Sequence, residues 1–147
     1  MEKTKHVKSE AVKSLEELAL RDLKKRYPSF PYPPKPKFND KTSNTLTKCI
    51  ITYTRLRGFF AERVNATGQQ IKTGNTTRWV KGSSHVGSAD VHAVIQGRAV
   101  MIEIKIGNDF QSQAQRDYQK KIEQSGGVYL IVRTFQDYYN WFNKKGA

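Results

Sequence analysis

Apolar and polar side chains alternate along a segment near the middle of the chain, from Ala99 to Ile106. Because successive side chains of a β-strand point to opposite faces, this pattern predicts a strand with one apolar and one polar face. The apolar face is formed by Val100, Ile102, Ile104 and Ile106. The polar face carries Glu103 and Lys105. A second extended stretch, Ala89–Ile95, precedes it across the turn-like sequence Gln96-Gly97-Arg98, so the two predict a β-hairpin.

Asp90 lies at the start of this hairpin and would lie beside Glu103. Two carboxylates and the ammonium group of Lys105 would then converge on the polar face. This set suits a hard divalent cation such as Mg²⁺, because the carboxylates supply oxygen ligands and the lysine can orient or activate a water molecule. The alternative is that both carboxylates are ordinary surface groups facing solvent, with Lys105 as a surface partner.

The signature Asp90, a gap of twelve residues and Glu103-Ile104-Lys105 resembles the active-site motif of the PD-(D/E)XK nuclease superfamily, which has the restriction-endonuclease-like fold. Further motifs follow in an order similar to its virus-type replication-repair nuclease (VRR-NUC) branch and, more loosely, to Holliday-junction resolvases. They are Gly87-x-x-Asp90, Ile102-Glu103-Ile104-Lys105, Ser112-x-x-Gln115-x-x-Tyr118, Gly126-Gly127 and the strand Val128–Arg133. The resemblance covers roughly residues 43 to 143.

This resemblance implies a metal-dependent nuclease, most simply an endonuclease, that hydrolyses DNA phosphodiester bonds in replication, recombination or repair. It implies Mg²⁺ or Mn²⁺ as the cofactor, held by Asp90, Glu103 and the backbone carbonyl of Ile104. It also implies that Lys105 positions the attacking water and stabilises charge in the transition state. A homodimer would suit cleavage of both strands, although the sequence does not determine the symmetry.

Gln115 has two interpretations. In VRR-NUC-like sequences this glutamine belongs to the active-site signature. Ser112-x-x-Gln115 is also a capping box, in which the glutamine side chain accepts a hydrogen bond from the serine backbone. Helical spacing places Gln111 and Tyr118 beside Gln115, so either can help to line the site.

The helix predicted over Ser43–Leu56 departs from the family, because it has no acidic residue where many members carry a Glu. Asn44 is the nearest polar substitute, and Glu62 on the next strand is a weaker one. Because one carboxylate is missing, the sequence does not determine whether the mechanism uses one metal ion or two, or whether the activity is weakened. The alternative function is therefore a catalytically weak or inactive nuclease-fold module that binds nucleic acid and bridges it to a partner protein. A nuclease that acts on RNA is a third, less favoured class.

Other polar residues are candidates for accessory roles. His92 is predicted on the face of Asp90, where a supporting role is favoured over a zinc site, and Ser88 precedes it. The candidate phosphate contacts are Arg78, Lys81 and Arg116, and Arg63 and Lys72 are secondary candidates. Trp79 and Tyr129 either stack on bases or, as the favoured alternative, pack in the core.

The chain has 147 residues and a formal net charge of +13, with the basic excess spread over both halves. A polyanion is the natural partner, bound with a steep salt dependence, unless the charge serves only solubility. No apolar run is long enough to span a membrane and no secretory signal is evident, so we expect an intracellular, cytoplasmic protein; a phage or bacterial origin fits the resemblance. The one cysteine, Cys49, excludes an intramolecular disulfide framework and is predicted in the core.

The length suits one domain, predicted over residues 39–147, with an extension over residues 1–38. The extension combines an amphipathic helix, Val7–Arg26, with a connector that holds all five prolines. Its apolar stripe can dock on the domain, pair with a second copy or contact a partner protein.

The predicted fold class is α/β, with an αβββαβ core and a mixed central sheet flanked by helices. The other predicted elements are strand Phe59–Asn65, a loop over Ala66–Asn75, a short strand Thr76–Val80, helix Ser112–Ser125 and a last helix capped by Thr134 and Asp137.

Overall fold

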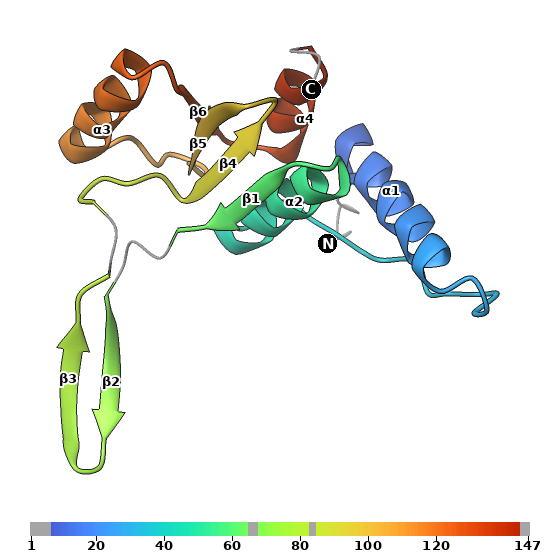
Figure 1. The fold of residues 1–147 in the computed structure, drawn as a ribbon, viewed down its shortest axis with the longest axis horizontal. Helices are drawn as coiled ribbons and strands as arrows, with labels where there is room; N and C mark the ends of the chain where they lie inside the picture. The colour runs from blue at the N-terminus through green and yellow to red at the C-terminus, as the bar shows by residue number, and fades with distance from the viewer. Residues whose placement is uncertain (1–6, 65–67, 83–84, 145–147) are drawn as a thin grey trace, which may run out of the picture.

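The structure, a computed structural model, describes residues 7–64, 68–82 and 85–144 (Figure 1). Its helices are α1 (Glu10–Arg26), α2 (Ser43–Leu56), α3 (Gln113–Gln124) and α4 (Phe135–Lys144). Its strands are β1 (Phe60–Arg63), β2 (Gln69–Thr73), β3 (Thr76–Val80), β4 (Val91–Ile95), β5 (Arg98–Ile104) and β6 (Val128–Val132). The fold class is α/β with a mixed sheet, as the sequence predicts.

The central sheet has the strand order β1-β4-β5-β6. Strands β1, β4 and β5 pair antiparallel, whereas β6 pairs parallel to β5. The β4–β5 hairpin turns at Gln96 and Gly97, whose positive φ angles of 52° and 75° suit a two-residue hairpin turn. Ile95 therefore pairs with Arg98, and the predicted hairpin is confirmed.

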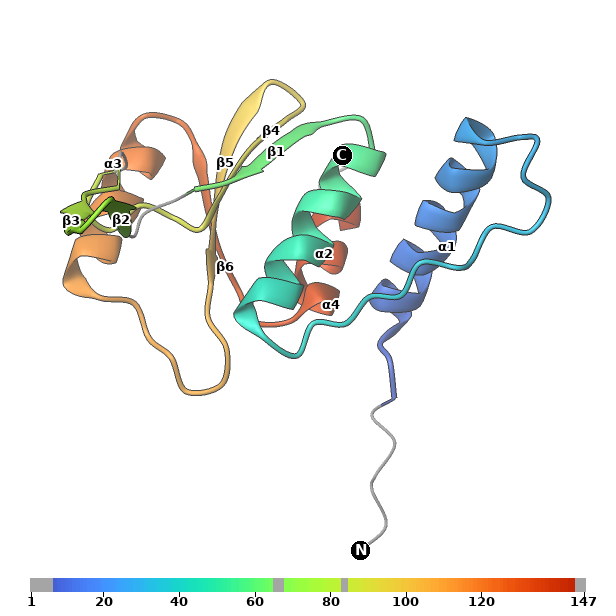
Figure 2. The ribbon, with the colours of Figure 1, turned by 90° about the horizontal axis from the view of Figure 1, so that it is seen from below.

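One face of this sheet packs against α2 and α4, and α1 lies outside these two helices (Figure 2). Of the predicted apolar face, Val100, Ile102 and Ile104 are buried in this core and Ile106 is partly buried; the sheet also contributes Val91, Ala93, Ile95 and Val132. An aromatic cluster fills the other half of the core: the ring of Tyr53 lies 5.1 Å from that of Phe142 and 5.7 Å from that of Phe135. The alternation in the sequence thus correctly predicted the buried face of the hairpin.

The N-terminal helix docks on the rest of the fold, which is one of the three alternatives that its apolar stripe left open. Ala11, Val12 and Leu15 are fully buried with side chains of α2 and α4. The backbone N–H of Ala11 also donates to Gln136 Oε1 of α4 at 3.0 Å. The helix begins at Glu10, later than predicted, because Ser9 accepts a hydrogen bond from the Val12 N–H and caps it. The domain boundary after residue 38 stays a prediction.

Two other helix ends follow the predicted cap chemistry. Gly58 follows α2 with a φ of +87°, a conformation that favours glycine. Thr134 and Asp137 exchange side-chain to backbone hydrogen bonds, each of 3.2 Å, at the start of α4. The predicted capping box is therefore confirmed.

The loop prediction over residues 66–75 is wrong for the part that the structure describes. Gln69–Thr73 forms β2 and pairs antiparallel with β3, the predicted short strand, as a separate ribbon. This part of the sequence has no apolar alternation, because the ribbon buries little and its strands are held together mainly by their backbone ladder. Residues 66 and 67, and Asn65 of the strand predicted before them, lie outside the described residues.

Cys49 is fully buried in α2, as predicted. Its Sγ lies 3.3 Å from the carbonyl oxygen of Asn39. Across the described ranges, no helix combines the length and the apolar character needed to cross a membrane.

Candidate active site

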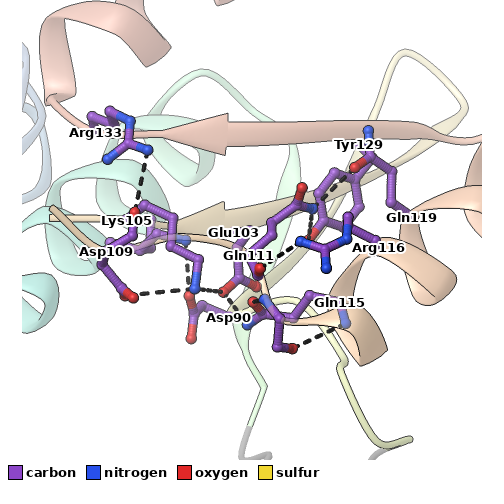
Figure 3. Close-up of polar contacts among 12 residues, drawn as sticks. Asp90, Glu103, Lys105, Asp109, Gln111, Gln115, Arg116, Gln119, Tyr129 and Arg133 are labelled. Atoms are coloured by element: carbon purple, nitrogen blue, oxygen red, sulfur yellow. Dashed lines mark hydrogen bonds and ion pairs between the residues drawn. The ribbon is translucent and has the colours of Figure 1, made fainter.

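The sheet face opposite the core carries a cluster of charged side chains at the ends of β4 and β5 (Figure 3). Val91 pairs with Ile102, so Asp90, the residue before β4, lies beside Glu103. Asp90 Oδ2 accepts a hydrogen bond of 2.8 Å from the backbone N–H of Ile104. This bond holds the Asp90 carboxylate against β5, next to Glu103.

Glu103 is the most buried member of the cluster, with 3% of its surface exposed. Its Oε1 accepts from Lys105 Nζ at 3.2 Å and from Gln115 Nε2 at 2.5 Å. Its Oε2 has no hydrogen-bond partner, and among the described residues it is the one buried side-chain polar atom in that condition. Burial and then the charge of Asp90 raise the pKa of Glu103 to about 7, although Lys105 acts in the opposite direction.

Gln115 forms the predicted capping box with Ser112 and also contacts Glu103; its predicted part in an active site stays a prediction. Its Oε1 accepts from the Ser112 N–H at 2.9 Å, and the Ser112 hydroxyl accepts from the Gln115 N–H at 3.2 Å. Because the cap uses the amide oxygen, the amide nitrogen is left to donate to Glu103. The capping box therefore orients the group that contacts Glu103.

Gly87 allows α3 to approach the segment that carries Asp90. Its φ is +78°, and a Cβ atom there would lie 2.4 Å from the backbone of Ala114. No other residue type fits without displacing the first turn of α3. The glycine in the motif Gly87-x-x-Asp90 thus helps to place α3, and with it Gln115, over the carboxylates.

The accessory residues form a polar row beside Asp90. His92 Nε2 lies 3.4 Å from the Ser88 hydroxyl and 3.2 Å from the Tyr118 hydroxyl. Glu62 on β1 pairs in register with His92. Burial lowers the pKa of His92, and the charge of Glu62 partly offsets this effect. The row connects β1 and β4 to α3.

Several other predicted residues are not brought to the carboxylates. Asn44 Oδ1 accepts from the guanidinium of Arg63 at 2.7 Å, so the structure places it with Arg63 and not with Glu103. Arg78 and Lys81 belong to the β2–β3 ribbon and the segment after it. Arg116 lies closer, but its guanidinium donates to the carbonyl of Gln111 at 2.8 Å and to Gln113.

The two aromatic candidates have different surroundings. Tyr129 is 8% exposed, and its hydroxyl accepts from Gln111 Nε2 at 3.4 Å. Burial raises the pKa of Tyr129 to about 12. Trp79 is 65% exposed, so the favoured prediction of core packing is wrong for this residue.

Two residues that the sequence analysis did not identify also shape the site. Lys105 Nζ contacts Asp109 Oδ2 at 3.5 Å, and Arg133 donates to the carbonyl oxygens of Gly107 and Asp109. Asp109 lies in a segment without periodic structure, so no pattern predicted it. The alternation of the last strand did carry a signal for Arg133, because it shares a face with Tyr129.

The donor set fits a hard divalent cation. Asp90 and Glu103 supply carboxylate oxygens, and the Glu103 Oε2 atom is buried without a partner. Mg²⁺ commonly binds through one or two carboxylates and retains several waters. Within the described ranges, no group of three or more His, Cys, Asp or Glu side chains is placed to hold a metal, so the backbone and water would have to complete the coordination.

No protein-family model matches the chain, and no curated protein does.

Proposed function

We propose that this protein is a metal-dependent nuclease of the PD-(D/E)XK type that hydrolyses DNA phosphodiester bonds as an endonuclease. The observation that carries the proposal is the buried, partnerless Oε2 of Glu103 in a cluster with Asp90 and Lys105. A buried carboxylate oxygen without a hydrogen bond costs stability, so its presence calls for a functional explanation. A bound cation would satisfy it.

The order of elements supports the proposal. A helix, three antiparallel strands, a helix and a strand parallel to β5 correspond to the αβββαβ arrangement that the resemblance implies. Glu103 and Lys105 lie on and after β5, the third of these strands, and Asp90 precedes the second. The net charge of +13 favours a polyanionic substrate.

Asp90, Glu103 and the backbone carbonyl of Ile104 would hold Mg²⁺ or Mn²⁺. When bound, the ion would polarise the scissile phosphate and lower the pKa of a water molecule. Lys105, 5% exposed, keeps its ammonium group beside Glu103 through contacts with Glu103 and Asp109. That charge would stabilise the negative oxygens of the phosphate as they develop further charge. Gln115 would act as a positioning residue for Glu103.

Cleavage assays test the proposal. Wild-type protein is expected to cut at least one DNA in a panel of linear, nicked, flapped and four-way-junction substrates with Mg²⁺ or Mn²⁺, and to cut none in EDTA. Glu103→Gln and Lys105→Ala are each expected to reduce the rate at least about 100-fold, because the first removes a charged metal ligand and the second removes a positive charge beside the phosphate.

Glu123→Gln is the matched control, since Glu123 is an exposed carboxylate on α3 whose hydrogen bond is to Gln119. It should cut as fast as the wild type. The proposal is wrong if wild-type protein cuts no DNA in either metal, or if Glu103→Gln cuts at the wild-type rate.

A second candidate is a nuclease-fold module that binds nucleic acid without cutting it. It is favoured by the absence of any Asp or Glu from α2, which leaves Asp90 and Glu103 as the two carboxylates proposed to hold the metal. Tight, salt-sensitive DNA binding with no cleavage in any metal would support this candidate over the nuclease.

A further inference from the structure

The β2–β3 ribbon is a projecting arm, defined here as residues 68–82. Its two strands pair with each other and with no strand of the central sheet. Figure 1 shows it extending away from the rest of the fold. The side chains described on β2 and β3 are exposed, except for the half-buried Val80. The arm therefore contributes little to the core, although its two strands form a continuous five-pair ladder.

The arm is positively charged along its length. From Arg63 to Ala89 the sequence contains no Asp or Glu, and within the arm it contains Lys72, Arg78 and Lys81. Ile71 pairs with Arg78 and Lys72 pairs with Thr77, so Lys72 and Arg78 lie on opposite faces of the ribbon. Positive charge on both faces suits contact with phosphates on both sides of the arm.

Trp79 is an exposed aromatic ring on the same face as Lys72. It is 65% exposed and pairs across the ribbon with Gln70. A Cβ atom at Gly68 would lie 2.5 Å from Trp79 Nε1, so the indole rests directly against the glycine backbone. One side of the ring therefore contacts the glycine backbone, and most of the rest of the side chain is exposed to solvent.

We infer that this arm binds nucleic acid, with Trp79 stacked on an unpaired base and Lys72 and Arg78 contacting phosphates of separate strands. Base faces are accessible only where strands are unpaired, since stacking within a duplex covers them. The arm would therefore direct the protein to DNA whose strands diverge, such as a fork or flap. This inference rests on the proposed function, because it assigns the substrate class of the same nuclease.

Binding in EDTA tests the arm without requiring cleavage. Fluorescence anisotropy with a labelled fork, single strand and duplex of equal length would compare wild type with Trp79→Ala. We expect the variant to bind the fork and the single strand about tenfold more weakly, the loss of one base–aromatic stack. Duplex affinity should change less than about twofold.

Tyr32→Ala is the matched control, since Tyr32 is an aromatic residue that is 89% exposed in the N-terminal connector. It should leave all three affinities unchanged. Fork binding by Trp79→Ala within twofold of wild type, an equal loss on the duplex, or no binding of any DNA by the wild type would each overturn the inference.

The phosphate contacts have their own readout. The double variant Lys72→Gln, Arg78→Gln should show a weaker salt dependence of fork binding. The negative slope of log association constant against log salt concentration should become shallower by about 1.5. Lys24→Gln combined with Lys25→Gln removes the same charge from the exposed end of α1 and should leave the slope unchanged. An equal change in both double variants would contradict a specific role for the arm.

Fluorescence gives a direct test of stacking. The chain has two tryptophans, so in Trp141→Phe protein Trp79 is the only one. Addition of an unlabelled single strand should quench its emission, and unchanged emission at saturating DNA would overturn the inference. Quenching together with a complete lack of metal-dependent cleavage would contradict the proposed nuclease and leave the arm's DNA binding intact. Metal-dependent cleavage by the wild type, with no effect of Trp79→Ala on DNA binding, would support the proposed nuclease and contradict the role of the arm.

Discussion

The two sides of the central sheet bury different kinds of residue. On the side of α2 and α4, the sheet residues Val91, Val100 and Ile102 are at most 1% exposed. On the other side Val94 and Ile131 are 46% and 42% exposed, while Glu103 and Lys105 are 3% and 5% exposed. Helix α3, which lies on this side, has no buried residue of its own. One side is packed for stability, and the other buries charge while leaving apolar side chains in water.

Two buried glutamates in different parts of the molecule illustrate the difference between packed and charged regions. Glu16, on α1, accepts from the Phe38 N–H at 2.8 Å and pairs with Lys8. Burial alone would raise the pKa of Glu16, but these hydrogen bonds outweigh it and the pKa is lowered. Glu103 has the opposite shift and an oxygen without a partner. The first carboxylate joins parts of the fold, whereas the second is buried with one oxygen unpartnered, at a cost in stability.

Truncation of an apolar side chain should separate the two sides most strongly. Ile102→Ala is expected to lower the free energy of unfolding by about 3 kcal/mol, because it leaves a cavity in a fully packed region. Ile131→Ala, on the neighbouring strand β6, should cost less than about 1 kcal/mol since its side chain is partly in water. Urea unfolding measures both, and equal losses would contradict the comparison.

The two glutamates should give opposite pH dependences in metal-free buffer. The raised pKa of Glu103 means that its contribution to stability is present below its usual value of 4.5 and is lost as the pH rises through about 7. Glu103→Gln should therefore gain stability relative to wild type by about 3 kcal/mol between pH 4.5 and pH 8.

Glu16 contributes in the other direction, because its lowered pKa gives stability above its usual value of 4.5 that is lost as the pH falls through the folded-state pKa. Glu16→Gln should therefore be less stable than wild type by about 2 kcal/mol at pH 7, with a smaller deficit in acid. Unfolding curves across the pH range provide the check; a deficit for Glu103→Gln that grows from pH 4.5 to pH 8 would refute the comparison.

Metal addition should change stability less than Ile102→Ala does, and the change should depend on Glu103 alone of the two glutamates. Saturating Mn²⁺ is expected to stabilise wild-type protein by about 2 kcal/mol, which corresponds to a rise in Tm of about 5 °C that EDTA reverses. Glu16→Gln should keep the full rise, whereas Glu103→Gln should lose it. Differential scanning fluorimetry measures the shift, and an equal rise in both variants would place the metal elsewhere.

The local patterns of the chain predicted most of the fold. The alternation around Ile102 identified the hairpin and its buried face, and the cap sequences at Thr134 and Ser112 identified helix starts. These signals are local, because side-chain period and cap hydrogen bonds involve residues only a few positions apart. The β2 strand was not predicted, because its mostly polar residues do not alternate between apolar and polar side chains.

The candidate site was predicted in part. Asp90, Glu103, Lys105 and Gln115 do converge, and a two-residue turn was enough to place the first two side by side. The contribution of Asp109 was not predictable, because it depends on how the segment after β5 folds back on the end of β6, where Arg133 donates to the carbonyl oxygen of Asp109.

Local sequence patterns predict which residues face the core, where several helices begin and which charged groups share a strand face, because these depend on backbone geometry over short distances. The docking of α1 on α2 and α4, the burial of Glu103 with one oxygen unpartnered and the exposure of Trp79 on an arm depend on the three-dimensional fold. Burial and partnership are set by the segments that meet in space, and those segments lie far apart along the chain.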